Sequence, residues 1–137
     1  MYKDIIKRLI EQDPFLKTLG VKVISFSNGR CKISVEFKES LTRTGGIMNG
    51  GAIATLADAA GGCAVLTCNE GNDQVTVDLD ISFLRPIRKG PVTAEAKVTK
   101  KGISISFADI SIFDGSKTLC AIAKGTWFFM GKLPRKD

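Results

Sequence analysis

The sequence predicts an α+β domain in which an antiparallel sheet wraps around one long, buried helix. Two observations predict this class. Residues 52–66 are almost wholly apolar, so a helix formed there has hardly any polar face. Segments with strand-like alternation precede and follow this run, in the order helix, two strands, helix, four strands. Because such a helix cannot lie on the outer side of a flat sheet, we expect the strands to surround it.

The whole chain, residues 1–137, is expected to form this single domain. Its hydrophobic content of 44% and charged content of 25% are those of an ordinary globular protein. A chain of 137 residues is long enough for one substantial core but offers no sign of a second.

The N-terminus predicts a helix over about residues 2–12. Its apolar residues recur at helical spacing, and Pro14 after Asp13 disfavours continuation. A short turn closed by Gly20 is expected next. Charged residues interleave this segment, whereas a signal peptide needs an uninterrupted apolar stretch.

The strands are predicted from alternation with a period of two. Residues 21–23 and 31–37 flank a Ser27–Gly29 turn and predict a hairpin. The clearest half-buried strand covers residues 75–83. Further strands are expected at 91–100, 103–113 and 118–129, separated by turns at Lys101–Gly102 and Asp114–Gly115. The apolar parity changes near Ala108 and Asp109, which indicates a bulge there.

The central helix, about residues 50–67, carries one ionisable carboxylate, Asp58. A charged carboxylate in an apolar core costs several kcal/mol unless it is paired or neutralised. A catalytic role explains its presence. The alternative is a structural carboxylate held by the Thr55 hydroxyl or a nearby N–H. Asp78 and Asp80 are expected to be solvated strand residues, and Trp127, Phe128 and Phe129 core or interface aromatics.

Composition excludes several kinds of chemistry. The chain has no histidine, which removes His-activated nucleophiles and His-ligated zinc. Its four cysteines lack the paired spacing of a zinc site, so we expect no metal and buried, reduced thiols in a cytoplasmic protein. The longest apolar run is short for a bilayer span and contains Asp58, so no membrane segment is predicted.

The formal charge of +6 favours an anionic partner. Nucleic acid would require a basic helix or exposed aromatic side chains on a strand, and the sequence indicates neither. A small molecule that carries phosphate fits the charge as well.

Geometry along the central helix favours a homodimer. Gly50 and Gly51 stand where the first N–H groups of the helix point outward and attract an oxyanion, although a diglycine can also be a tight helix start. Asp58 lies roughly 10 to 12 Å further along the axis, too far to serve the same carbonyl group. Antiparallel helices in two copies of the chain would bring Gly50 of one opposite Asp58 of the other.

Three motifs agree in spacing with one known family. They are Gly46-Ile47-Met48-Asn49-Gly50-Gly51, then Leu56-Ala57-Asp58, and finally Thr76-Val77-Asp78-Leu79 with Phe83-Leu84-Arg85-Pro86. Together they resemble the hotdog-fold acyl-CoA thioesterases of the PaaI-like type, over nearly all of the chain after about residue 14. The resemblance implies a homodimer, often paired again into a tetramer, that hydrolyses acyl-coenzyme A without metal or any cofactor beyond its substrate.

The resemblance also implies roles for single residues. Asp58 would act as nucleophile or as general base toward water, the Gly50 N–H would hold the thioester oxygen, and Thr76 would lie near the attacking water. Substrate-binding residues are then expected at Gly51, Thr76, Arg85, Lys101 and Gly102. Arg88, Lys89 and Lys100 extend a basic cluster able to meet phosphates, unless it is only a solvated rim.

One departure from the family is Asn49, where many relatives have histidine. An amide can orient water or a carbonyl group but cannot transfer protons at neutral pH. The alternative function is therefore an acyl-CoA-binding or sensing protein without turnover. A dehydratase on the same fold is disfavoured by the missing histidine.

Overall fold

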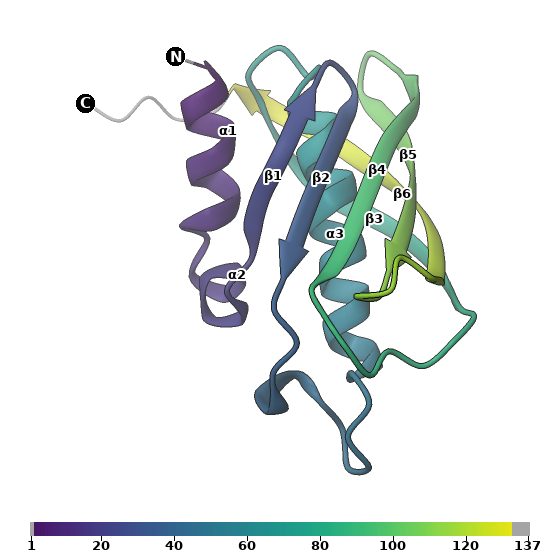
Figure 1. The fold of residues 1–137 in the computed structure, drawn as a ribbon. Helices are drawn as coiled ribbons and strands as arrows, with labels where there is room; N and C mark the ends of the chain where they lie inside the picture. Colours follow the sequence, from purple (N-terminus) through teal and green to yellow (C-terminus); the bar gives the residue numbers. More distant parts are fainter. Residues whose placement is uncertain (1, 133–137) are drawn as a thin grey trace.

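The structure is a computed structural model that describes residues 2–132. Its elements follow the predicted order (Figure 1). Two short helices, α1 and α2, precede a β-hairpin; the long helix α3 and four strands complete the chain. The bounds are α1 Tyr2–Glu11, α2 Pro14–Leu19, β1 Lys22–Ser27, β2 Arg30–Val35, the 3-10 helix η1 Glu39–Leu41, α3 Gly50–Leu66, β3 Asn72–Phe83, β4 Val92–Lys101, β5 Ile105–Phe113 and β6 Leu119–Lys132.

The six strands form one antiparallel sheet in the order β1-β2-β4-β5-β6-β3. The sheet curves around α3, which confirms the predicted α+β architecture (Figure 1). Strand β3 follows α3 in the chain but pairs with β6, so β3 forms one edge of the sheet and β1 the other. The strand that follows the central helix therefore presents an unpaired backbone edge within the described chain.

Close packing of α3 on the sheet depends on small residues. Most of the helix is buried, as its apolar sequence requires. At Gly61 an added Cβ would overlap the Trp127 ring, which is itself 2% exposed. Only glycine allows the indole to approach the helix backbone this closely.

The N-terminal elements follow their local signals. Helix α1 ends at Glu11, close to the predicted end. Asp13 then caps α2, its Oδ1 accepting hydrogen bonds of 3.0 Å from Phe15 N and from Leu16 N. Gly20 ends α2 with φ of +76°, the left-handed conformation that glycine adopts without strain. Pro14 therefore starts a second helix as well as ending the first.

The predicted bulge at Ala108 and Asp109 is wrong. Both residues pair regularly, and the register shift lies in the neighbouring strand β4, between Val98 and Lys100. Burial keeps one parity throughout β5, because Ile105 and Phe107 are apolar but exposed on the outer face while the even-numbered residues point inward. The apparent change of parity arises because apolar residues lie on both faces of one regular strand.

The expectation that strands carry no exposed aromatic side chains is also wrong. Phe107 and Phe128 are 36% and 43% exposed, on β5 and β6. Trp127 is buried as expected. Among residues 2–132, no helix is long and apolar enough to cross a membrane.

Candidate active site

The start of α3 leaves one backbone N–H group without an acceptor. Asn49 is the N-cap, and its Oδ1 accepts a hydrogen bond of 2.7 Å from Gly51 N. The Asn49 carbonyl oxygen accepts from Ala52 N and Ile53 N. Within residues 2–132, the Gly50 N–H is thus the first helical donor that no protein acceptor occupies. It carries the positive end of the helix dipole and can bind an oxyanion.

Of Asn49, Gly50 and Gly51, only Gly50 keeps a backbone N–H group that is free to bind a substrate oxygen. The Gly51 N–H, an expected substrate contact, is engaged by the Asn49 cap. Asn49 itself is exposed, and its side-chain oxygen serves the helix rather than a ligand. Phe83 lies beside Gly50, because a Cβ added at Gly50 would be 3.6 Å from its ring. The Phe83 side chain is 53% exposed, so it forms an apolar wall next to the free N–H group.

Asp58 lies in the middle of α3 and is half-buried, on the stripe of the helix that the sheet leaves uncovered. Its partner is Thr76 of β3, whose Oγ1 is 2.6 Å from Asp58 Oδ1 and donates a hydrogen bond to it. Thr55, the structural partner considered from sequence, donates instead to the Gly51 carbonyl oxygen at 2.9 Å. The carboxylate therefore meets a neighbouring strand and not its own helix.

Two surface depressions mark the uncovered side of α3. One, of about 360 Å³, adjoins Asn49, Gly51 and Thr55 near the start of the helix. The other, of about 230 Å³, contains Asp58 and Thr76. In a single chain the start of α3 and Asp58 therefore border different depressions, and Gly50 lines neither of them.

The expected basic residues do not form one cluster within the chain. Arg85 follows the end of β3, and its guanidinium donates to the Leu119 carbonyl oxygen at 2.7 Å, where β6 begins. Lys101 ends β4 and pairs with Glu70 at 3.0 Å. Glu70 lies beside Lys132, the last residue of β6, so Arg85 and Lys101 lie at opposite ends of that strand. Gly102 lies beside Lys101, in the turn between β4 and β5.

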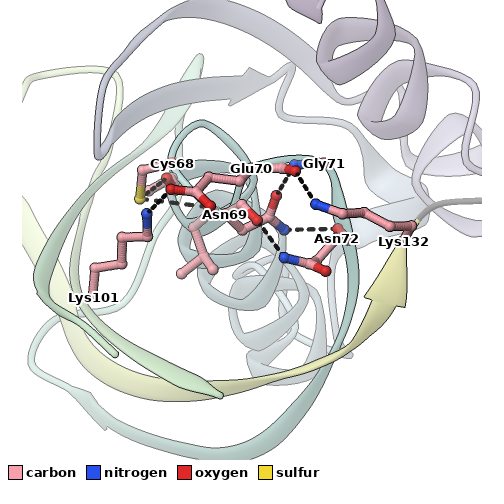
Figure 2. A network of polar contacts seen from close by, with 9 residues as sticks. Cys68, Asn69, Glu70, Gly71, Asn72, Lys101 and Lys132 are labelled. Carbon is pink, nitrogen blue, oxygen red and sulfur yellow. Dashed lines mark hydrogen bonds and ion pairs between the residues drawn. The ribbon is translucent and has the colours of Figure 1, made fainter. Parts of the chain in front are cut away.

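Figure 2 shows a polar network around Lys101 that the sequence did not reveal. Asn69 is buried, and its Nδ2 donates to the Asn72 carbonyl oxygen and to Gln74 Oε1. The Gln74 side chain in turn donates to the Gly62 carbonyl oxygen of α3 at 2.7 Å. The turn after α3 is thus tied to both the helix and β3, two residues before Thr76. The only signal of this network in the sequence is the turn-forming segment Asn69-Glu70-Gly71-Asn72.

The cysteine thiols offer no alternative nucleophile in the described part of the chain. All four are free, and Cys31, Cys63 and Cys120 are buried, as expected. Burial raises the pKa of the Cys68 thiol, and a hydrogen bond with Cys63 together with burial raises the pKa of Cys31. Raised thiol pKa values disfavour the reactive thiolate form. Within residues 2–132, no three His, Cys, Asp or Glu side chains lie close enough to hold a metal ion.

Comparison with known proteins gives concordant matches. The model of the thioesterase superfamily matches residues 45–121. The chain is 42% identical over 118 residues to the "Putative esterase SSO2140" of Saccharolobus solfataricus, covering 86% of this chain and 84% of that protein. It is 27% identical over 112 residues to human acyl-coenzyme A thioesterase 13, covering 80% of each chain.

Solved structures agree on the architecture. The PaaI protein of the phenylacetic acid degradation operon of E. coli superposes with a TM-score of 0.85 and 26% identity, covering 96% of this chain and 94% of that chain. A thioesterase family protein from Silicibacter pomeroyi superposes with a TM-score of 0.88 over 96% of this chain and 99% of that chain, at 22% identity, which speaks for the fold alone. The expected hotdog fold is confirmed.

Proposed function

This chain belongs to the thioesterase superfamily and is a thioester hydrolase, and from this premise we propose that it hydrolyses acyl-coenzyme A at sites shared between two subunits. The observation that carries the proposal is the pair of groups on α3: an N–H at Gly50 without an acceptor, and a carboxylate at Asp58 held by Thr76. An oxyanion donor and a base are the two groups that thioester hydrolysis requires.

The edge strand β3 supports the two-subunit arrangement. Its outer edge is unpaired within residues 2–132, and Val75 and Val77 on it are 43% and 58% exposed. Such an edge is a template for pairing with another strand. Antiparallel pairing of β3 with its copy would continue the sheet and run the two α3 helices in opposite directions. Gly50 of one subunit would then face the partner's Asp58.

In this site the Gly50 N–H binds the thioester oxygen and stabilises its negative charge in the tetrahedral intermediate. Thr76 occupies Asp58 Oδ1, which leaves Oδ2 to accept a proton from water. The water oxygen bonds to the carbonyl carbon as its proton passes to Asp58. Collapse of the intermediate breaks the carbon–sulfur bond, and the coenzyme A thiolate leaves and takes up the proton held by Asp58, which regenerates the base.

The same pairing gives the basic residues a common role. Because β3 and its copy run antiparallel, the Arg85 end of one subunit lies toward the Lys101 end of the other. We assign Arg85 and Lys101, with the Gly102 turn, to the phosphates of coenzyme A. Glu70 competes for Lys101, so the lysine must exchange this partner when a phosphate binds.

The proposal is tested by measuring thiol release from a panel of acyl-coenzyme A thioesters. The wild type should release thiol, and Asp58→Asn should lower kcat by about 100- to 10,000-fold while binding substrate with similar affinity. Asp109→Asn is the matched control, because it removes an exposed carboxylate of β5, a strand away from the β3 edge. A wild type that binds acyl-coenzyme A tightly without releasing thiol would instead establish the alternative, an acyl-CoA-binding or sensing protein. Asn49 is the reason to test this alternative, because an amide cannot transfer protons as a histidine can.

A further inference from the structure

We propose that Gln74 is a positioning residue, which sets the Thr76 hydroxyl on the Asp58 carboxylate by tying strand β3 to helix α3. This inference rests on the proposed function, because it concerns how the base of that reaction is held. Gln74 Nε2 donates to the Gly62 carbonyl oxygen at 2.7 Å, one helical turn after Asp58. Gln74 and Thr76 are two residues apart on β3, so both side chains leave the strand on the face that meets α3.

The pairing of β3 with β6 does not by itself fix this part of the strand. The ladder is regular from Gln74 to Thr76, but its register shifts on both sides, between Asp73 and Gln74 and between Thr76 and Asp78. A slip of one residue would move each side chain to the opposite face of the sheet. Bulges next to an active site change the direction of side chains. Contacts with α3 therefore contribute to the register of this short segment.

A buried asparagine fixes the orientation of the Gln74 amide. Asn69 is 1% exposed; its Oδ1 accepts from Gly71 N at 3.1 Å, and its Nδ2 donates to the Asn72 carbonyl oxygen at 2.8 Å (Figure 2). These two contacts decide which end of the Asn69 amide is the donor. Nδ2 also donates to Gln74 Oε1 at 2.9 Å, so the Nε2 end of Gln74 faces α3. Gln74 thus presents the donor that the Gly62 carbonyl oxygen accepts.

Gln74 lies beside the base but acts on it through Thr76. It lines the depression that contains Asp58 and Thr76. Its amide is closely packed, because a Cβ added at Gly62 would be 3.4 Å from Gln74 Nε2 and 3.3 Å from Trp127 Nε1. The hydrogen bond to Asp58 comes from Thr76 Oγ1. Without the tie to α3, the segment that carries Thr76 can move relative to the helix, and this bond lengthens.

The experiment measures kcat and KM for acyl-coenzyme A hydrolysis together with the melting temperature. Gln74→Met keeps the length of the side chain but can make neither hydrogen bond. It should lower kcat about tenfold or more with KM within about twofold, because a misplacement of about 1 Å can cost about 100-fold in rate. Gln74→Glu keeps an acceptor for Asn69 but places a carboxylate against the Gly62 carbonyl oxygen, and it should lower kcat as much.

A double substitution separates positioning from a merely structural role. In a Thr76→Val background the hydroxyl that Gln74 positions is already gone, so adding Gln74→Met should lower kcat further by less than about threefold. Losses of kcat that multiply to the full product of the single variants would overturn the inference. An unchanged kcat in folded Gln74→Met, or in Gln74→Glu where only that variant folds, would also overturn it. Failure of both variants to fold would assign the amide to stability alone and overturn it too.

Gln12→Met is the matched control, because it makes the same exchange at an exposed position after α1 that does not line the depression. It should leave kcat and KM unchanged. If Asp58→Asn lowers kcat while both Gln74 variants keep the wild-type value, this inference fails and the proposed function stands. A wild type that releases no thiol from any acyl-coenzyme A would overturn the proposed function as well.

Discussion

A hydrogen bond of 2.6 Å from Thr76 Oγ1 to Asp58 Oδ1 joins the edge strand β3 to the middle of the central helix α3. Both residues are half-buried, so the carboxylate keeps access to substrate while one of its oxygens is fixed. The bond makes the position of the base depend on the register of β3. That register is held two residues earlier by Gln74, which bonds to α3 at Gly62.

Removing the Thr76 hydroxyl should affect turnover more than folding. In Thr76→Val the carboxylate loses a charge-assisted hydrogen bond that orients it, so we expect kcat to fall about 10- to 100-fold with KM nearly unchanged. Thr76→Ser restores the donor and should restore most of kcat. Steady-state kinetics and thermal melting of both variants provide the check. A lowered melting temperature with unchanged kcat would assign Thr76 a structural role only.

Replacing Gly50 by proline removes the proposed oxyanion donor with little disturbance of the helix. Proline is favoured at the first helical position, and Asn49 already has the extended backbone that a following proline requires, with φ of −62° and ψ of 133°. We expect kcat to fall about 100- to 1000-fold. Gly50→Ala retains the N–H and adds only a Cβ at 3.6 Å from Phe83. If the two variants have equal kcat, the donor lies elsewhere.

Asn49 substitutions separate capping from electrostatics. Asn49→Ala loses the bond to Gly51 N and should destabilise the protein by about 1 kcal/mol, visible as a lower melting temperature. Asn49→Asp keeps a capping oxygen, and therefore stability, but places a negative charge beside the Gly50 N–H. Its kcat/KM should fall at least about tenfold. Unchanged kcat/KM in Asn49→Asp would argue against anionic charge developing at this helix start.

The Glu70–Lys101 pair predicts a specific pH dependence. A hydrogen bond from Lys101 and its positive charge lower the pKa of the Glu70 carboxyl below its ordinary value. A lowered carboxyl pKa contributes stability above the ordinary pKa of about 4.3, and this contribution is lost as the pH falls through the lowered pKa. NMR titration should show the Glu70 pKa rising in Lys101→Met. Because the pair is exposed, melting temperatures should differ little even at neutral pH. An unchanged Glu70 pKa would contradict the assignment.

The sequence predicts an element correctly where its residue pattern is compatible with only one local structure. An apolar run around Asp58 can only be a buried helix, and Gly20 after α2 can hardly be anything but a helix end. The faces of β5 were misjudged because Ile105 and Phe107 are apolar yet exposed, and hydrophobicity alone does not distinguish a core side chain from a surface one.

Residue patterns within one segment do not predict contacts between segments that are distant in the sequence. The pairing of Asp58 with Thr76 depends on where β3 crosses α3, and nothing local in either segment sets that crossing. The separation of Arg85 from Lys101 depends in the same way on the sheet order, which places β3 beyond β6. The capping of Gly51 by Asn49 is a local contact, and asparagine before a helix is a recognisable signal for it.

The proposed mechanism requires each active site to draw Gly50 from one subunit and Asp58 from the other. The measurement is the activity of hybrids made by unfolding and refolding a mixture of Gly50→Pro and Asp58→Asn chains. Each variant alone should have little activity, but a hybrid dimer holds one site with both native groups. Equal mixing should therefore recover about a quarter of wild-type activity, since roughly half of the dimers are hybrids. A mixture as inactive as its components, in dimers shown to exchange subunits, would place both groups in one chain and contradict the account.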